Sequence, residues 1–137
     1  MKYLVDADVL SEPTKPRPAQ RVVDWLRKFD RDLAVSPIIL GELEYGILLL
    51  PASRKRTRLL DWFAAGVKQL NVLEFDATTA SAWAKLLAEL QRKGKAMPIK
   101  DSLIAATAKQ HQLTLATRNT ADYRHAGVPL VNPFKER

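Results

Sequence analysis

The stretch Tyr-Leu-Val-Asp-Ala-Asp-Val-Leu-Ser-Glu, residues 3–12, is the part of the sequence from which the fold can be worked out. It opens with an apolar run of strand formers, which is typical of a buried parallel strand. The run ends at Asp6, and in open α/β sheets ligands bind at the carboxyl ends of the strands. A carboxylate there is poorly solvated unless something compensates its charge. Two roles for Asp6 follow: a ligand of a divalent cation in a cleft, or the cap of a helix that begins near Asp8.

The length and composition of the chain fit a single domain spanning residues 1–137. Hydrophobic residues make up 47% of the chain, which is enough for a core. The absence of cysteine excludes a disulfide framework and a thiolate zinc site. No apolar run approaches the roughly 20 residues that a membrane-spanning helix needs. The start of the chain has no signal-peptide pattern, so we expect a cytoplasmic protein that makes no membrane contact.

The charge of the chain favours a polyanionic partner. Lys and Arg number 22 against 15 Asp and Glu, which gives a net charge of +7. Such a balance is typical of proteins that bind nucleic acid, and it also suits an acidic protein partner or a solvated surface. Four of the cations gather at the start of a predicted helix, at Arg54, Lys55, Arg56 and Arg58. Cations there oppose the helix macrodipole, which indicates either an external anion or a solvated basic face.

Predicted strands and helices alternate along the sequence. The strands are predicted at residues 3–5, 33–35, 71–75, 113–117 and 128–131. The helices are predicted at residues 19–29, 38–50, 53–70, from a cap at Thr78 or Thr79 to Gly94, and at 103–110. An apolar stripe of Ala80, Trp83, Leu87 and Leu90 marks the buried side of the fourth helix. This alternation predicts a parallel sheet with helices on both faces.

Acidic and amide side chains occur at the junctions of these elements. Asp6 ends the first strand, and Glu42 lies about one turn into the helix that follows the second strand. Asn119 and Asp122 follow the fourth strand. The carboxyl ends of parallel strands lie at one edge of the sheet, so these side chains should gather there. Asp101, which begins the helix before the fourth strand, joins them if the connector at residues 96–100 bends.

Several carboxylates in one cleft repel one another and raise each other's pKa, so a cation must compensate them. Ligation by oxygen alone suits Mg²⁺ or Mn²⁺. Two such ions about 4 Å apart can activate water and stabilise the leaving oxygen in phosphodiester hydrolysis. A basic rim would then hold the nucleic-acid backbone, with Lys100, Arg118, Arg124 and residues 54–58 as candidates.

At these residues the chain resembles the PIN-domain family. Residues 3–12 resemble the family's opening, whose usual form is Asp-Thr-Asn. Residues 36–46 are similar to its second acidic motif and residues 101–108 to its third. Residues 117–123, followed by Asn-Pro-Phe at 132–134, resemble its close. The resemblance covers essentially the whole chain, and it is strongest to VapC-type toxins, particularly the FitB-like branch.

This resemblance implies an α/β fold, a three-layer sandwich around a central parallel five-stranded sheet. It implies a metal-dependent endoribonuclease, the toxin component of a type II toxin–antitoxin pair. Such an enzyme hydrolyses RNA phosphodiester bonds with metal-activated water, using Mg²⁺, for which Mn²⁺ can substitute. The implied partners are the RNA substrate, a VapB-type antitoxin and a second copy of the chain in a homodimer. Antitoxins of this type often insert a basic side chain into the acidic cleft.

The resemblance also implies roles for individual residues. Carried over by position, Asp6, Glu42 and Asp101 are the metal-site acids, and Thr117 helps to position an acid or a water molecule. The opening departs from the family in having Asp8 where Asn is usual.

The fourth acid is ambiguous in this sequence. Asn119 stands where some relatives have Asp, whereas Asp122 fits others. We take Asp122 as the fourth catalytic and metal-site acid and keep Asn119 as the other metal-site candidate. An amide at the metal-facing position would weaken the case for a second ion.

Two other classes of function fit the same residues. The chain could be a non-catalytic module whose acidic cleft binds an antitoxin or nucleic acid. It could also be a plain nucleic-acid binder, whose affinity would fall steeply with salt and ignore EDTA. Cleavage of RNA that depends on a divalent ion and on Asp6 and Asp101 would separate the enzyme from both.

Overall fold

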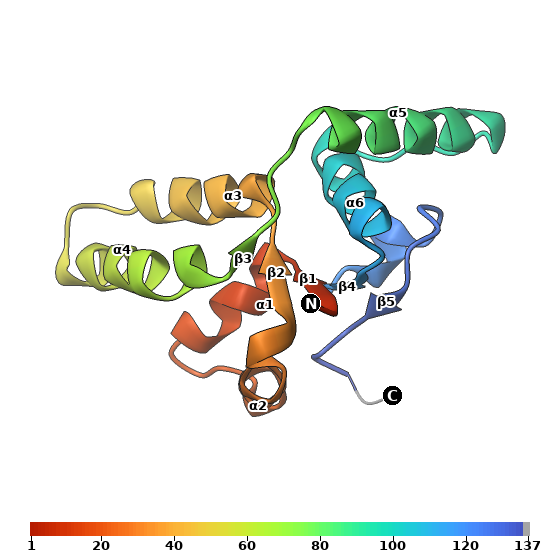
Figure 1. Cartoon of the computed structure of the whole chain (residues 1–137). Coiled ribbons are helices and arrows are strands. Elements are labelled where there is room, and N and C mark those ends of the chain that lie inside the picture. The colour runs from red at the N-terminus through yellow and green to blue at the C-terminus, as the bar shows by residue number, and fades with distance from the viewer. Residues whose placement is uncertain (136–137) are drawn as a thin grey trace.

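A five-stranded sheet runs through the centre of the molecule, a computed structural model that describes residues 1–135 (Figure 1). Its strands are β1 (Tyr3–Val5), β2 (Leu33–Val35), β3 (Asn71–Val72), β4 (Thr114–Ala116) and β5 (Leu130–Val131). They lie in the order β3-β2-β1-β4-β5, and every neighbouring pair is parallel. The predicted α/β fold with a parallel five-stranded sheet is therefore confirmed.

The first strand occupies the middle of this sheet. Leu4 pairs with Ala34 on one side and with Leu115 on the other, and all three side chains are fully buried. Strands covered on both faces must be apolar throughout, which explains the uninterrupted apolar run at the start of the sequence. The central position of β1 places Asp6 at the middle of the carboxyl edge, where its N–H donates to the Ala116 carbonyl at 2.9 Å.

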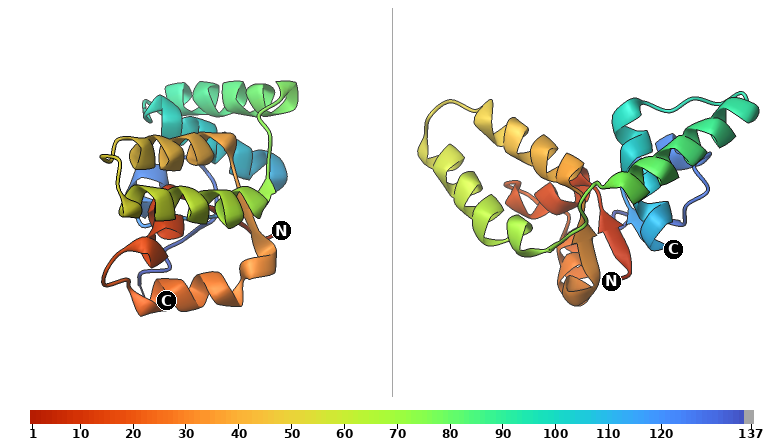
Figure 2. Two further views of the ribbon diagram at one scale, coloured as in Figure 1. Left: turned by 90° about the vertical axis from the view of Figure 1, so that its left-hand side faces the viewer. Right: turned by 45° about the horizontal axis from the view of Figure 1, so that its top comes forward.

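Helices cover both faces of the sheet. They are α1 (Ala7–Ser11), α2 (Gln20–Lys28), α3 (Pro37–Leu48), α4 (Arg54–Ala65), α5 (Ala77–Arg92) and α6 (Ile99–His111). Figures 1 and 2 show α3 and α4 side by side on one side of the sheet, with α5 and α6 on the other. Within residues 1–135, no helix has the length and apolar character that crossing a membrane requires.

The helix starts are set by hydrogen bonds from polar side chains. Ser36 caps α3, because its hydroxyl oxygen accepts a hydrogen bond from the Ile39 N–H at 3.2 Å. The prediction that Thr78 or Thr79 caps the fourth helix is wrong, since Asp76 occupies that position. The Asp76 carboxylate accepts from the Thr79 N–H at 3.0 Å, and the Thr79 hydroxyl accepts from the Asp76 N–H at 3.2 Å. This reciprocal capping box satisfies two amides at once, which a threonine cap alone does not.

Other predicted boundaries differ from the structure. The helix predicted at residues 53–70 stops at Ala65, and a short 3₁₀ turn, η3 (Val67–Gln69), follows Gly66. Glycine loses the most backbone entropy in a helix, so the break falls there. The third strand is shorter than the predicted residues 71–75, and it lies at the edge of the sheet. In α5, Leu86 is buried and Leu87 is 37% exposed, so the predicted stripe is wrong by one residue at that turn.

Candidate active site

Asp6 lies where β1 turns into α1. Its Oδ1 accepts a hydrogen bond from the Ala7 N–H at 2.8 Å, so Asp6 caps α1, and its Oδ2 accepts one from the Thr117 hydroxyl at 2.8 Å. Burial raises the pKa of the Asp6 carboxyl. The charges of Glu42 and Asp101 add to the increase, although the two hydrogen bonds oppose it. The capping role is therefore observed, and the carboxylate still lies within reach of two other negative charges.

Asp101 lies in the first turn of α6 and belongs to the same cluster of charges. The hydroxyl of Tyr123 donates a hydrogen bond to its Oδ1 at 3.2 Å. Burial is the main cause of the raised pKa of Asp101, and the charges of Asp122 and Glu42 add to it. The bond from Tyr123 and the positive charge of Lys100 act in the opposite direction. The connector before α6 therefore bends as the site required, and Asp101 joins the acids at the carboxyl edge.

Glu42 reaches the cluster from α3 and forms an ion pair there. The Nζ of Lys100 lies 2.6 Å from its Oε2. The hydrogen bond with Glu42 is the main cause of the raised pKa of Lys100; the charges of Asp101 and Asp6 add to the increase, and desolvation opposes it. The carboxylates of Asp6 after β1, Glu42 on α3 and Asp101 on α6 therefore act on a single ammonium group.

Asp8 adds a further acid beside Asp6. Its Oδ2 accepts hydrogen bonds from the Arg118 N–H at 3.2 Å and from the Asn119 amide at 3.4 Å. Its Oδ1 is buried, and no group of residues 1–135 forms a hydrogen bond with it. Burial and the charge of Asp6 raise the pKa of Asp8 to about 6. The departure from the family's usual Asn thus places a carboxyl that titrates near neutral pH at the rim of the cluster.

The two candidates for the fourth acid lie in different places. Asn119 points its amide at Asp8, and its N–H donates to the Thr117 hydroxyl oxygen at 3.1 Å. Asp122 is exposed in the 3₁₀ turn η4 (Thr120–Tyr123), and its negative charge acts on Asp101. Thr117 is fully buried and links the Asn119 backbone to the Asp6 carboxylate.

Sequence reasoning missed two features of this cluster. It treated Tyr123 only as part of a motif, although its buried hydroxyl bonds Asp101 directly. It placed Lys100 on a basic rim, whereas the side chain pairs with Glu42 inside the acidic cluster. Tyr123 follows the candidate acid Asp122 in the sequence, which was a usable signal for its role. Nothing in the spacing of the sequence indicated the pair of Lys100 with Glu42, because Glu42 lies on a helix far from Lys100 in the sequence.

The donor chemistry of the cluster fits a hard divalent cation. Its ligand atoms are all carboxylate oxygens, which Mg²⁺ and Mn²⁺ prefer. Within residues 1–135, however, no three acidic or histidine side chains are arranged so that they already enclose one ion. The hydrogen bonds of Asp6 and the ion pair of Glu42 with Lys100 direct those oxygens elsewhere. For these carboxylates to enclose a divalent ion, their side chains would have to rearrange, above all Glu42.

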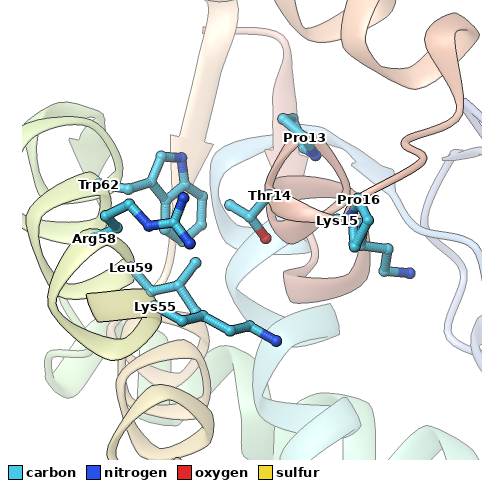
Figure 3. A pocket seen from close by; sticks show the side chains of 8 residues that line it. All are labelled: Pro13, Thr14, Lys15, Pro16, Lys55, Arg58, Leu59 and Trp62. Carbon is cyan, nitrogen blue, oxygen red and sulfur yellow. The ribbon is translucent and has the colours of Figure 1, made fainter. Parts of the chain in front are cut away.

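A groove leads away from the acidic cluster toward α4. The lining of a cavity of about 380 Å³ includes Asp8 and Glu42 of the acidic cluster and Leu59 and Trp62 of α4. Leu59 and Trp62 also line a neighbouring cavity of about 610 Å³. Figure 3 shows that second cavity, with Lys55, Arg58 and Trp62 of α4 on one side and residues 13–16 on the other. The two cavities share Thr14, Leu59 and Trp62, so they are neighbours; we refer to them together as the groove beside α4.

Comparison with known proteins places this arrangement in context. The PIN domain family matches residues 3–128. The chain is 36% identical to "Toxin FitB" of Neisseria gonorrhoeae over 97% of this chain and 99% of that protein. It is 32% identical to "VapC ribonuclease Y4jK" of Sinorhizobium fredii over 96% of this chain and 97% of that protein.

The fold is also similar to solved structures. A structure of FitAB bound to an IR36 DNA fragment superposes with a TM-score of 0.90 at 34% sequence identity. The match covers 98% of this chain and 97% of the other. The similarity in sequence and in fold extends over the same, nearly complete length.

Proposed function

The chain belongs to the PIN-domain family, in the VapC/FitB-like branch of toxins, and from this premise we propose that it is a metal-dependent ribonuclease of a type II toxin–antitoxin system. The ribonuclease assignment follows from relatives that align over nearly the whole chain. The observation that supports the metal dependence is the convergence of Asp6, Glu42 and Asp101. Burial raises the pKa of Asp6, and the negative charges of Glu42 and Asp101 add to the increase. Such a group of charges is stable in its ionised form only with a compensating cation.

Asp6, Glu42, Asp101 and Asp122 are the residues that would hold Mg²⁺ or Mn²⁺, with Asp122 favoured over Asn119 as the fourth acid. The position of Asp122 near Asp101 supports this choice, whereas the Asn119 amide is engaged with Asp8. A bound divalent ion supplies charge stabilisation for a phosphodiester and lowers the pKa of water. Asn119 would then act as a positioning residue at the rim.

The remaining groups of the site orient these acids. Thr117 donates to Asp6 and Tyr123 donates to Asp101, so each carboxylate keeps one oxygen in a fixed direction. Burial and the neighbouring carboxylates keep the Tyr123 hydroxyl protonated, because its pKa is raised far above the usual value. The Tyr123 hydroxyl therefore serves as a hydrogen-bond donor and not as a base.

RNA is the substrate class that fits the surroundings of the site. Lys55 and Arg58 line the groove at a distance from the acids, and within residues 1–135 neither forms an ion pair with a carboxylate. Arg118 lies next to the acids, since its N–H donates to Asp8, and its guanidinium lies over the Phe134 ring, 4.5 Å from the ring centre. Cations on both sides of the acids would hold the phosphates on either side of the bond that is cut.

Two protein partners complete the proposal. FitAB and IR36 DNA form one complex in the similar structure, which supports an antitoxin partner for this chain. We also propose a homodimer formed through α3, because the apolar side chains of Tyr45, Leu48 and Leu49 are 64%, 49% and 66% exposed. A single domain over residues 1–137 is consistent with the family match to residues 3–128.

The experiment that tests the proposal is cleavage of RNA by the antitoxin-free protein. Wild type should cut RNA with Mg²⁺ or Mn²⁺ and stop when EDTA is added. Asp6→Asn and Asp101→Asn should each lower the rate by about a hundredfold or more while still binding RNA. Asp61→Asn, an exposed residue of α4, is the matched control and should cut like wild type. Cleavage that persists in EDTA, or that survives both site substitutions, would contradict the proposal.

A further inference from the structure

We propose that Lys100 is a built-in counter-cation of the acidic site, which competes with the divalent ion for Glu42. This inference rests on the proposed function and adds to it a residue that controls how tightly the ion binds. The observation behind it is the 2.6 Å contact between the Lys100 Nζ and the Glu42 Oε2. A carboxylate oxygen held by an ammonium group has to leave it before it can ligate a metal.

The setting of Lys100 differs from that of an ordinary surface ion pair. Three carboxylates act on its ammonium, those of Glu42, Asp101 and Asp6, and they come from three different elements of the fold. These acids are the proposed ligands of the divalent ion. The ammonium therefore supplies, within the chain itself, part of the positive charge that the ion would bring.

The helix that carries Lys100 does not account for a lysine at this position. Lys100 is the second residue of α6, where a cation opposes the helix macrodipole. Its side chain is 54% exposed, so packing does not require it either. The favourable contact that remains is the one with the acidic cluster.

The pair links two helices of the site as well as two charges. Glu42 lies on α3 and Lys100 on α6, and these helices contact each other beside the end of β1. Glu42 would exchange one cationic partner for another on binding a divalent ion, and the Lys100 ammonium would be free of it. Next to Asp101, that ammonium would be available to a phosphate of the RNA substrate.

The test measures Mn²⁺ binding to the antitoxin-free protein by isothermal titration calorimetry at fixed pH and about 150 mM salt. Lys100→Met should bind Mn²⁺ about three- to tenfold more tightly than wild type, because Glu42 no longer has a competing partner. Lys100→Arg keeps the charge and should stay within about twofold of wild type. Thermal unfolding in EDTA checks that each variant is folded.

A charge-matched control separates competition from a general charge effect. Lys95→Met removes one positive charge from the exposed connector before α6 and leaves the Glu42 contact intact. At this salt concentration a charge that is not in contact with the site is largely screened, so its Mn²⁺ affinity should match wild type.

Each result of this experiment has a definite meaning. Equal Mn²⁺ affinities for wild type and Lys100→Met, or equal gains for Lys100→Met and Lys95→Met, would overturn the inference while leaving the metal site in place. Weaker binding by Lys100→Met would overturn it as well. If neither wild type nor Lys100→Met binds Mn²⁺, the metal site of the proposed function fails, and the inference fails with it.

Discussion

At the scale of a single residue, the raised pKa of Asp8 predicts how the stability of the protein depends on pH. Its folded-state pKa of about 6 lies above the ordinary value of 3.8 because the carboxyl is largely buried and lies next to Asp6. The folded chain therefore holds this proton more tightly than the unfolded chain. The contribution of Asp8 to the free energy of unfolding should therefore fall as the pH rises from about 4 to about 6 and level off above that range.

Asp8→Asn removes the carboxyl whose ionisation lowers the free energy of unfolding, and it restores the Asn that the family usually has. We expect the variant to be more stable than wild type by about 1 kcal/mol at pH 7.5, with little difference at pH 4. This gain in the free energy of unfolding is smaller than the full pKa shift implies, since part of the Asp8 side chain is solvated. Urea unfolding in EDTA at several pH values measures it, with Asp61→Asn on the exposed face of α4 as the control. Parallel pH curves for Asp8→Asn and wild type would contradict the explanation.

The sequence predicted the acids of the site better than it predicted their partners. The positions of Asp6 and Glu42 follow from the order of strands and helices, because a parallel sheet brings their segments to one edge. Asp101 lies at the start of the helix before β4, and it reaches the same edge because the connector before α6 bends, which the order of elements did not predict. Which hydrogen bond or ion pair each of them forms depends on side chains from other elements. The resemblance implied that Thr117 positions an acid, and the structure identifies that acid as Asp6. The contact of Lys100 with Glu42 became visible only in three dimensions.

At the scale of the elements, helix α4 is the part to test for RNA binding. Lys55→Ala together with Arg58→Ala should weaken RNA binding by the uncleaving Asp6→Asn protein and lower its salt dependence. Two lost phosphate contacts correspond to a decrease of about 1.4 in the slope of log K against log salt. Binding curves at several salt concentrations measure this slope.

The control for α4 removes the same charge from another helix. Lys85→Ala with Arg92→Ala, both exposed on α5, should change RNA affinity little. Equal losses for the two double variants would mean that net charge alone binds RNA and that the groove beside α4 plays no special part.

The sequence predicted the bounds of the central strands better than those of the edge strand β3 and of helix α5. The predicted strands at residues 3–5 and 33–35 are confirmed, because buried central strands are defined by their apolar runs. The edge strand β3 has only two residues, and an exposed edge leaves no such pattern to count. The cap of α5 was misplaced because Asp76 and Thr79 act together, and either residue type alone is a common cap.

At the scale of the whole molecule, the exposed apolar face of α3 predicts the oligomeric state. Leu48→Glu with Leu49→Glu should convert a dimer into a monomer. The substitutions replace exposed apolar side chains, which the dimer would cover, with charged ones. Light scattering after size-exclusion chromatography at micromolar concentration measures the mass. Leu87→Glu, a partly exposed leucine of α5, is the control and should leave the mass unchanged. A wild-type protein that is monomeric at every concentration would contradict the proposed dimer.

The gathering of carboxylates from distant segments around a divalent ion is tested most directly by a crystal soaked in Mn²⁺. The account predicts an anomalous difference peak about 2.2 Å from carboxylate oxygens of both Asp6 and Asp101. Crystals of Asp6→Asn grown and soaked in the same way should lack this peak. A protein that cuts RNA with Mn²⁺ but shows no peak between these two side chains would contradict the account.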